Sequence, residues 1–241
     1  SSINGSTINS INRLMKEDQA IQSLLNKQVD GVIYMSNRLP EKVMDAFERT
    51  DTPVVLAGTK DNREDLPSVT IDYKKADTEA LNLMFNDGKN LGIVVGDPDA
   101  VVNNDYRIPA YKEFIKEHDL GEARIYTNVM DYSDGYNLYS QLAKDGVDGV
   151  IVTRDSSAVG ILNSAMDAGK NVPKDLEIVT ASATQIASVV RPALTTIKQP
   201  LYDMGAVAMR MLTKLMNNEE VEDVHIELPY ELVKKQSTLN Q

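Results

Sequence analysis

Side chains able to perform covalent or metal chemistry are scarce in this chain of 241 residues. It contains no cysteine and two histidines, His118 and His225, which lie far apart in the sequence. Without cysteine the chain has no thiol nucleophile, thiolate zinc site, iron–sulfur cluster or disulfide. Two isolated histidines are also too few for a multi-histidine metal site. We therefore expect no metal, no cofactor and no catalytic residue.

The glycine and serine motifs of nucleotide-binding proteins and hydrolases are missing as well. The sequence holds no G-x-G-x-x-G, no G-x-x-x-x-G-K-[ST] and no G-x-S-x-G. We expect His118 at a helix C-terminus, where the helix dipole favours its ring, and His225 on an edge strand. The chain is thus predicted not to be an enzyme.

The charge of the chain narrows the range of partners. Asp and Glu number 36 against 25 Lys and Arg, so the formal net charge is −11. Direct contact of these residues with nucleic acid is disfavoured, because phosphate contacts need clustered basic residues. The polar start SSINGSTINSINRLMKEDQ is unlike a signal peptide, and no apolar run approaches the roughly 20 residues of a membrane span. We expect a cytoplasmic protein.

Short apolar runs alternate with segments of helical periodicity. Strands are predicted over 29–35, 53–57, 68–71, 91–96, 123–126, 149–153, 177–181 and 195–198. Helices are predicted over 16–27, 39–49, 74–87, 106–118, 134–145, 156–168 and 202–217. Several of the strands are apolar on both faces, which is typical of buried parallel strands. Gly88, Gly121, Gly146 and Gly169 follow helical stretches, where a left-handed C-cap is expected.

This alternation predicts an α/β fold with doubly wound parallel sheets. The segments 27–36 and 144–155 share V-D-G-V-I, either by chance or because each opens an equivalent strand in two similar halves. Ligands of such sheets bind beyond the carboxyl ends of the strands. The candidate site residues on this ground are Ser36, Gly58, Thr59, Asp72, Gly96, Asp97, Arg154, Asp155 and Ser182.

Longer motifs in the second half of the chain are specific. The segments 160–180 (GILNSAMDAGKNVPKDLEIVT), 189–200 (VVRPALTTIKQP), 202–217 (YDMGAVAMRMLTKLMN) and 232–238 (LVKKQST) resemble the lactose-repressor family of transcription regulators. Within that family they are most similar to its catabolite control branch in Gram-positive bacteria. The segments 27–36, 53–58 and 67–76 agree in order and spacing, so the resemblance covers about residues 20 to 238.

The resemblance implies two lobes similar to type I periplasmic binding proteins, joined by three crossovers near Asp72, Gln199 and Glu222. One lobe would hold 1–71 and 200–222, the other 72–199 and 223–241. The first lobe is expected to be incomplete, because the residues before Val29 are too few for the strand, helix and strand that the family places there. The family's helix-turn-helix headpiece is likewise expected to be absent, which accounts for the acidic charge.

The implied function is the effector-binding and dimerisation core of a bacterial regulator of carbon catabolite control. The resemblance implies four partners: serine-phosphorylated phosphocarrier protein HPr, a sugar-phosphate effector, a second copy of the chain, and operator DNA through the headpiece. A periplasmic-type sugar-binding protein shares the architecture and remains the alternative.

The resemblance also implies effector-binding residues. Arg107 matches an effector-binding arginine in R-x-x-G-[YFW], although Ala110 replaces the glycine; alternatively it is an exposed residue at a helix start. Asp155 matches an aspartate in the ligand cleft; alternatively it caps the helix from Ser156. Arg154 beside it could neutralise an acidic ligand. Ser182 stands where many relatives carry an aspartate, so small-molecule affinity is expected to be weak or altered.

Two further sets of residues are assigned on the same basis. Arg191 matches an arginine that relatives use near the phosphoserine, with a structural salt bridge as the alternative. Tyr202, Met204, Met209 and Met211 lie on a helix that dimerises in relatives, whereas a methionine stripe of this kind is otherwise core.

Overall fold

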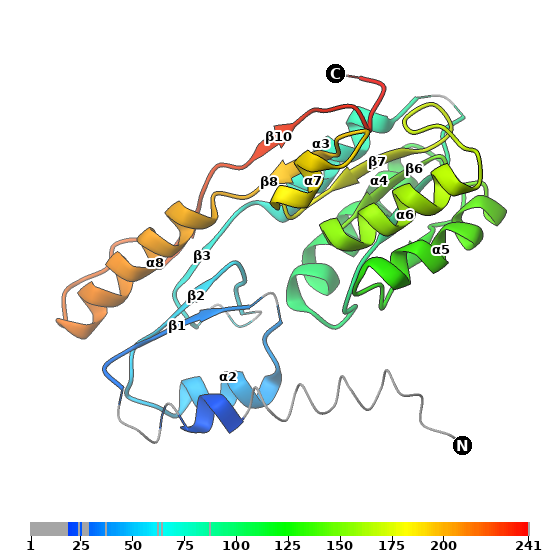
Figure 1. Cartoon of the computed structure of the whole chain (residues 1–241). Coiled ribbons are helices and arrows are strands. Elements are labelled where there is room, and N and C mark those ends of the chain that lie inside the picture. Colours follow the sequence, from blue (N-terminus) through cyan, green and yellow to red (C-terminus); the bar gives the residue numbers. More distant parts are fainter. Residues whose placement is uncertain are drawn as a thin grey trace, which may run out of the picture. The chain divides into compact units, whose positions relative to one another are not determined.

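The computed structural model describes residues 19–23, 25, 29–36, 38–61, 63, 65–86 and 88–240. The chain forms two compact units, each built from segments that are distant in sequence (Figure 1). Unit 1 comprises Ser1–Thr70 and Tyr202–Ile226, and unit 2 comprises Ile71–Leu201 and Glu227–Gln241. The chain therefore passes between the units after Thr70, Leu201 and Ile226. Of the helix predicted over 16–27, residues 19–23 and 25 are helical and the others lie outside the described residues.

Unit 1 has a sheet of four strands in the order β1-β2-β3-β9. Its strands are β1 (Val32–Met35), β2 (Val54–Ala57), β3 (Ser68–Thr70) and β9 (His225–Glu227), and its helices are α2 (Glu41–Glu48) and most of α8 (Leu201–Met216). The pairs β1–β2 and β2–β3 are parallel. His225 thus lies on an edge strand of this sheet, as predicted.

Unit 2 has a sheet of six strands in the order β10-β8-β7-β6-β4-β5. The strands are β4 (Leu91–Val94), β5 (Ile125–Tyr126), β6 (Gly149–Val152), β7 (Glu177–Thr180), β8 (Thr195–Lys198) and β10 (Glu231–Val233). All pairs are parallel except β10–β8, which is antiparallel. The helical segments are α3 (Tyr73–Met84), the π-helix η1 (Val102–Arg107), α4 (Ile108–Glu117), α5 (Tyr132–Lys144), α6 (Asp155–Asp167) and α7 (Gln185–Val189).

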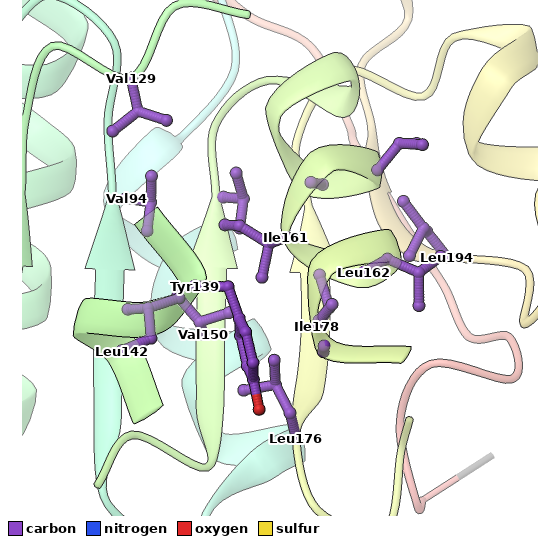
Figure 2. Packing of buried hydrophobic residues seen from close by; sticks show 14 of the residues in the cluster. Val94, Val129, Tyr139, Leu142, Val150, Ile161, Leu162, Leu176, Ile178 and Leu194 are labelled. Atoms are coloured by element: carbon purple, nitrogen blue, oxygen red, sulfur yellow. The ribbon is translucent and has the colours of Figure 1, made fainter. Parts of the chain in front are cut away.

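The core of unit 2 lies between the sheet and the helices α5, α6 and α7 (Figure 2). Val94, Val150 and Ile178 of neighbouring strands form one buried cluster with Leu142 of α5 and Ile161 and Leu162 of α6. The side chains that alternate with them along the strands are equally buried. Both faces of the sheet are therefore covered, as expected for doubly wound parallel strands, and the predicted α/β fold with parallel sheets is confirmed.

The glycine of the repeated V-D-G motif has the same packing role in each unit. A Cβ atom on Gly31 would lie 2.9 Å from Leu212 Cδ1, and one on Gly149 would lie 2.7 Å from Leu91 Cδ2. At either distance an added Cβ atom would force the leucine side chain to shift, so each glycine lets a leucine pack against the start of its strand.

The four glycines expected as helix C-caps have positive φ angles, between 67° and 87°. Gly146 and Gly169 directly follow the C-cap residues of α5 and α6, as predicted, whereas Gly88 and Gly121 lie beyond the ends of α3 and α4, so the prediction is wrong for these two.

The sequence did not predict η1, α7 or β10. Helix α7 has five residues and β10 has three, which is too short for a periodic pattern to be recognised. The π-helix η1 has the polar sequence VNNDYR and lacks α-helical periodicity. His118 does end a helix as predicted: it is the C-cap of α4, and its ring stacks on that of Phe114.

The motif LVKKQST near the C-terminus joins the central strands of unit 2. Ser237 is fully buried; its Oγ donates to the carbonyl of Ile178 in β7 and accepts from the backbone N–H of Thr195 in β8. Thr238, also buried, shares a hydrogen bond with the Thr195 hydroxyl over 2.8 Å. These hydroxyls satisfy backbone and side-chain groups that water cannot reach.

We expect Ser237→Ala to lower the free energy of unfolding of unit 2 by about 1–3 kcal/mol, because the change leaves buried polar groups without partners. Urea denaturation followed by circular dichroism measures the loss. Ser133→Ala, at an exposed position of α5, is the matched control and should leave the midpoint unchanged. Equal midpoints for both variants would contradict a role of Ser237 in joining β7 and β8.

Candidate functional site

The carboxyl ends of β4, β6 and β7 bring several predicted residues to one edge of the sheet of unit 2. Gly96 and Asp97 follow β4, Arg154 and Asp155 follow β6, and Ser182 follows β7. Because these strands are parallel neighbours, the side chains that follow them lie at the same edge. Arg107 does not directly follow a strand of this sheet; it is the last residue of η1.

The side chain of Asp155 is hydrogen-bonded to other residues of the chain. Its carboxylate is buried and accepts from the hydroxyl of Thr180, and from both the backbone N–H and the hydroxyl of Thr184. The alternative interpretation of Asp155 as a helix N-cap is wrong, because α6 already includes Asp155 and its side chain bonds instead to β7 and the loop that follows. The carboxylate fixes that loop.

Ser182 is bound in the same loop. Its hydroxyl donates to the carbonyl of Thr153 over 3.0 Å, which ties the end of β7 to the end of β6. The next residue, Ala183, has a φ of 51°, a left-handed conformation that is strained for a residue with a Cβ atom. Asp155 and Ser182 together therefore hold the loop 181–184 in one conformation.

The Arg154 side chain has no hydrogen bond or ion pair to any of the described residues. It lies over Gly96, where an added Cβ atom would be 2.9 Å from Arg154 Nε and 3.2 Å from Met130 Sδ. Gly96 is therefore needed for Arg154 to lie along the edge of the sheet. The guanidinium remains half-buried and unpaired there.

Arg107 is almost completely buried and forms an ion pair with Asp77 of α3. Arg107 Nη1 donates to Asp77 Oδ1 over 2.9 Å, and the guanidinium carbon lies 5.3 Å from the centroid of the Tyr73 ring. The alternative interpretation of Arg107 as an exposed helix-start residue is wrong, since it is 3% exposed. Among the described residues, Arg107 makes no direct hydrogen bond or ion pair with Asp155, Ser182 or Arg154.

Burial dominates the electrostatics around this pair. It raises the pKa of the Asp77 carboxyl above its ordinary value, while the charge and the hydrogen bond of Arg107 oppose that rise. Burial also raises the pKa of the Tyr73 phenol to about 12, again against the effect of Arg107. The Tyr73 hydroxyl is thus neutral at physiological pH and donates to Gln199 Oε1 over 3.3 Å.

Sequence reasoning missed Asp77, Tyr73 and Gln199. A usable signal was present for Asp77, because Tyr73, Asp77, Ala80 and Met84 share the buried face of α3 at helical spacing. A carboxylate on such a face requires a buried partner. Gln199 links segments far apart in sequence, since its Nε2 donates to the carbonyl of Ala181, and no local pattern indicates that bond.

Arg191 lies on the surface immediately after α7. Its Nη1 donates to the carbonyls of Ser188 and Val190, so its partners are backbone groups and not the carboxylate of a salt bridge. Lys235 Nζ donates to the hydroxyl of the same Ser188 over 2.8 Å. Two cationic side chains therefore meet at one exposed serine, beside Val189, which is 60% exposed.

The residues assigned to a dimer interface on α8 fall on two different faces. Tyr202 is 88% exposed and Met209 is exposed, but Met204 and Met211 are buried in unit 1 together with Ala208 and Leu212. Met204 and Met211 are thus core residues, which corrects their assignment to a surface. Arg210 and Lys214 lie on the exposed side, next to Met209.

The described residues include no group of three or more histidine, aspartate or glutamate side chains that could hold a metal ion. None of the described helices is long and apolar enough to cross a membrane.

We expect Asp155→Ala to lower the stability of unit 2 by about 2–4 kcal/mol, because it removes the acceptor of three hydrogen bonds. Thermal denaturation measures the change, and Asp99→Ala, at an exposed position, is the control. Loss of the fixed 181–184 loop should also speed amide exchange at Thr184. A variant with unchanged exchange at Thr184 would show that Asp155 does not hold this loop.

Comparisons with known proteins agree on one family. The family described as "Periplasmic binding protein-like domain" matches residues 88–238. The HTH-type transcriptional regulator pepR1 of Lactobacillus delbrueckii subsp. lactis is 68% identical over 231 residues, which cover 95% of this chain and 69% of that protein. Catabolite control protein A of Streptococcus mutans is 41% identical over 225 residues, covering 92% of this chain and 68% of that protein.

A solved structure gives the same result for the fold. The crystal structure of the transcription regulator CcpA of Lactococcus lactis has a TM-score of 0.87 and 37% identity, covering 95% of this chain and 85% of that chain. These relatives are transcription regulators, which favours this interpretation over that of a solute-binding protein or an enzyme. The chain belongs to the lactose-repressor (LacI) family of transcription regulators, and it spans the effector-binding, periplasmic-binding-protein-like core of that family.

Proposed function

We propose that this chain is the corepressor-binding and dimerisation core of a regulator of carbon catabolite control, and that its corepressor is HPr phosphorylated on a serine. The similarity to catabolite control protein A supports the regulatory role. Operator DNA would be bound by a helix-turn-helix headpiece outside these residues. The corepressor would act by binding the DNA-binding state more tightly than the other state, since only that difference in affinity shifts the equilibrium.

The observation that supports a phosphorylated protein as corepressor is the basic pair on unit 2. Arg191 and Lys235 both bond to Ser188 and remain at the surface. A phosphoserine carries about −1.5 to −2 charges and three acceptor oxygens, which suit an arginine next to a lysine. Exposed Val189 and Ile186 on α7 add apolar surface at the same place, as a protein partner requires.

The edge of the sheet in unit 2 supports a protein corepressor over an uncharged sugar. The Asp155 carboxylate accepts three hydrogen bonds from Thr180 and Thr184, and Ser182 donates to a backbone carbonyl. A sugar hydroxyl would have to displace these partners and would gain little from the exchange. The Arg154 guanidinium has no partner among the described residues, so a small effector that binds at this edge is proposed to be an anionic sugar phosphate, held weakly.

Arg191→Ala is expected to weaken binding of serine-phosphorylated HPr by about tenfold or more, because a charge-assisted hydrogen bond to phosphate is lost. Isothermal calorimetry with phosphorylated and unphosphorylated HPr measures the effect. The difference between the two HPr forms should shrink in the variant, since the arginine is proposed to contact the phosphate.

Arg210→Ala is the comparison variant, because Arg210 is also exposed but lies on α8 of unit 1. If Arg191→Ala leaves the affinity unchanged while Arg210→Ala abolishes it, the phosphoserine contact lies on α8 and the assignment of Arg191 is wrong. If wild-type protein binds neither form of HPr, the proposed corepressor itself is wrong.

The proposed homodimer needs exposed apolar surface, and α8 provides it through Tyr202 and Met209. Both are exposed on unit 1, and they lie seven residues apart, so they share one face of the helix. Aromatic and methionine side chains are typical of protein interfaces. Unit 2 exposes Tyr132 and Met166 on α5 and α6, which are the rival surface.

We expect the wild-type chain to sediment as a dimer at micromolar concentration, and Tyr202→Glu/Met209→Glu to shift it to a monomer by placing charges in an apolar contact. Analytical ultracentrifugation measures both. Met166→Glu serves as the matched control on unit 2. Dissociation by Met166→Glu alone would place the interface on unit 2, and a monomeric wild type would contradict dimerisation of the core.

A further inference from the structure

The ion pair between Arg107 and Asp77 is buried but poorly satisfied. The side chains are 4% and 0% exposed, and one hydrogen bond joins them. Asp77 Oδ2 has no partner among the described residues. The guanidinium has five N–H donors, and those on Nε and Nη2 have no acceptor in the described part of the chain.

Such a pair is not expected to stabilise the fold. Burial of two charges costs more than a single hydrogen bond returns, unless the remaining donors and acceptors are also satisfied. An arginine–carboxylate pair selected for strength is usually bidentate, whereas this one uses one oxygen and one nitrogen. The pair therefore calls for an explanation other than stability.

The surroundings of Arg107 point to ligand recognition. Arg107 ends the π-helix η1, which follows the loop at the carboxyl end of β4, and π-helical turns occur frequently at functional sites. The Tyr73 ring lies under the guanidinium, which fixes its plane while leaving its edge for hydrogen bonds. Asp77 then supplies the negative charge that an anionic ligand would otherwise bring.

We propose that Asp77 is a specificity-determining residue: it acts as the internal anion of Arg107 and keeps phosphate and similar anions off that guanidinium. A phosphate beside Arg107 would face the Asp77 carboxylate at close range, and the two negative charges repel in this buried site. An uncharged hydroxyl meets no such repulsion when it accepts from a free N–H of Arg107.

This inference rests on the proposed function, since it concerns which small effectors the core can use. Its test measures the binding of small anions and does not involve HPr. If the HPr experiment fails, the role of Asp77 is still decided by the binding of small anions.

Asp77→Asn is the variant that tests the proposal, because it removes the charge and keeps the shape and one acceptor oxygen. We expect the variant to bind inorganic phosphate roughly tenfold or more tightly than the wild type, measured by calorimetry at constant ionic strength set with chloride. Arg154→Gln is placed in both backgrounds to remove the half-buried guanidinium at the carboxyl edge of the sheet. The gain should vanish in Asp77→Asn/Arg107→Gln, whose neutral pair leaves no guanidinium to bind phosphate.

A folded Asp77→Asn variant that binds phosphate no better than the wild type would overturn the proposal. If Asp77→Asn does not fold, the wild type is compared with the neutral double variant Asp77→Asn/Arg107→Gln. Equal phosphate affinity of these two proteins supports the proposal, because Arg107 then contributes nothing to anion binding while Asp77 is present. Weaker binding by the double variant would show that Arg107 already binds anions, and Asp77 would have no excluding role.

Discussion

The burial of parallel strands on both faces is the constraint on which the rest of unit 2 depends. β4, β6 and β7 are fully buried along their length, so their side chains pack against helices and cannot meet a ligand. Function is thereby confined to the loops at the carboxyl edge and to the outer surfaces of the helices. The cluster in Figure 2 is the physical reason why every candidate residue of unit 2 lies outside the strands.

Because function is confined to these places, the hydrogen bonds within the carboxyl edge of the sheet indicate which ligands it can bind. Asp155 and Ser182 use their polar atoms to fix the loop 181–184. An edge built to bind a neutral ligand would leave its donors and acceptors free, or bonded to water that a ligand can displace. The observed bonding instead rigidifies the edge and leaves recognition to Arg154 and to the surface of α7.

Most helices and strands could be predicted from the sequence, because each depends on a pattern of neighbouring residues. Apolar runs located strands β1 to β8, and Gly146 and Gly169 marked the left-handed ends of α5 and α6. The two faces of α8 could also have been separated in advance: Tyr202, Met209 and Met216 repeat every seven residues on the exposed side, and Met204 and Met211 do so on the buried side. The partner of Arg107 was not predictable in this way, since Asp77 lies 30 residues earlier and meets it only through the packing of α3 against η1.

The acidic composition is compatible with an anionic partner because positively charged side chains lie together at one place on the surface. The net charge of −11 repels phosphates at long range, but that effect is screened within about 8–10 Å at physiological salt. Recognition of an anionic partner then depends on the few charged groups that lie within that distance of it. Arg191 and Lys235 are held together by Ser188, so they present a fixed pair of positive charges to whatever approaches α7. A phosphorylated protein that also covers Val189 gains apolar burial there, which a free phosphate does not, and this difference favours a protein over a small anion at this surface.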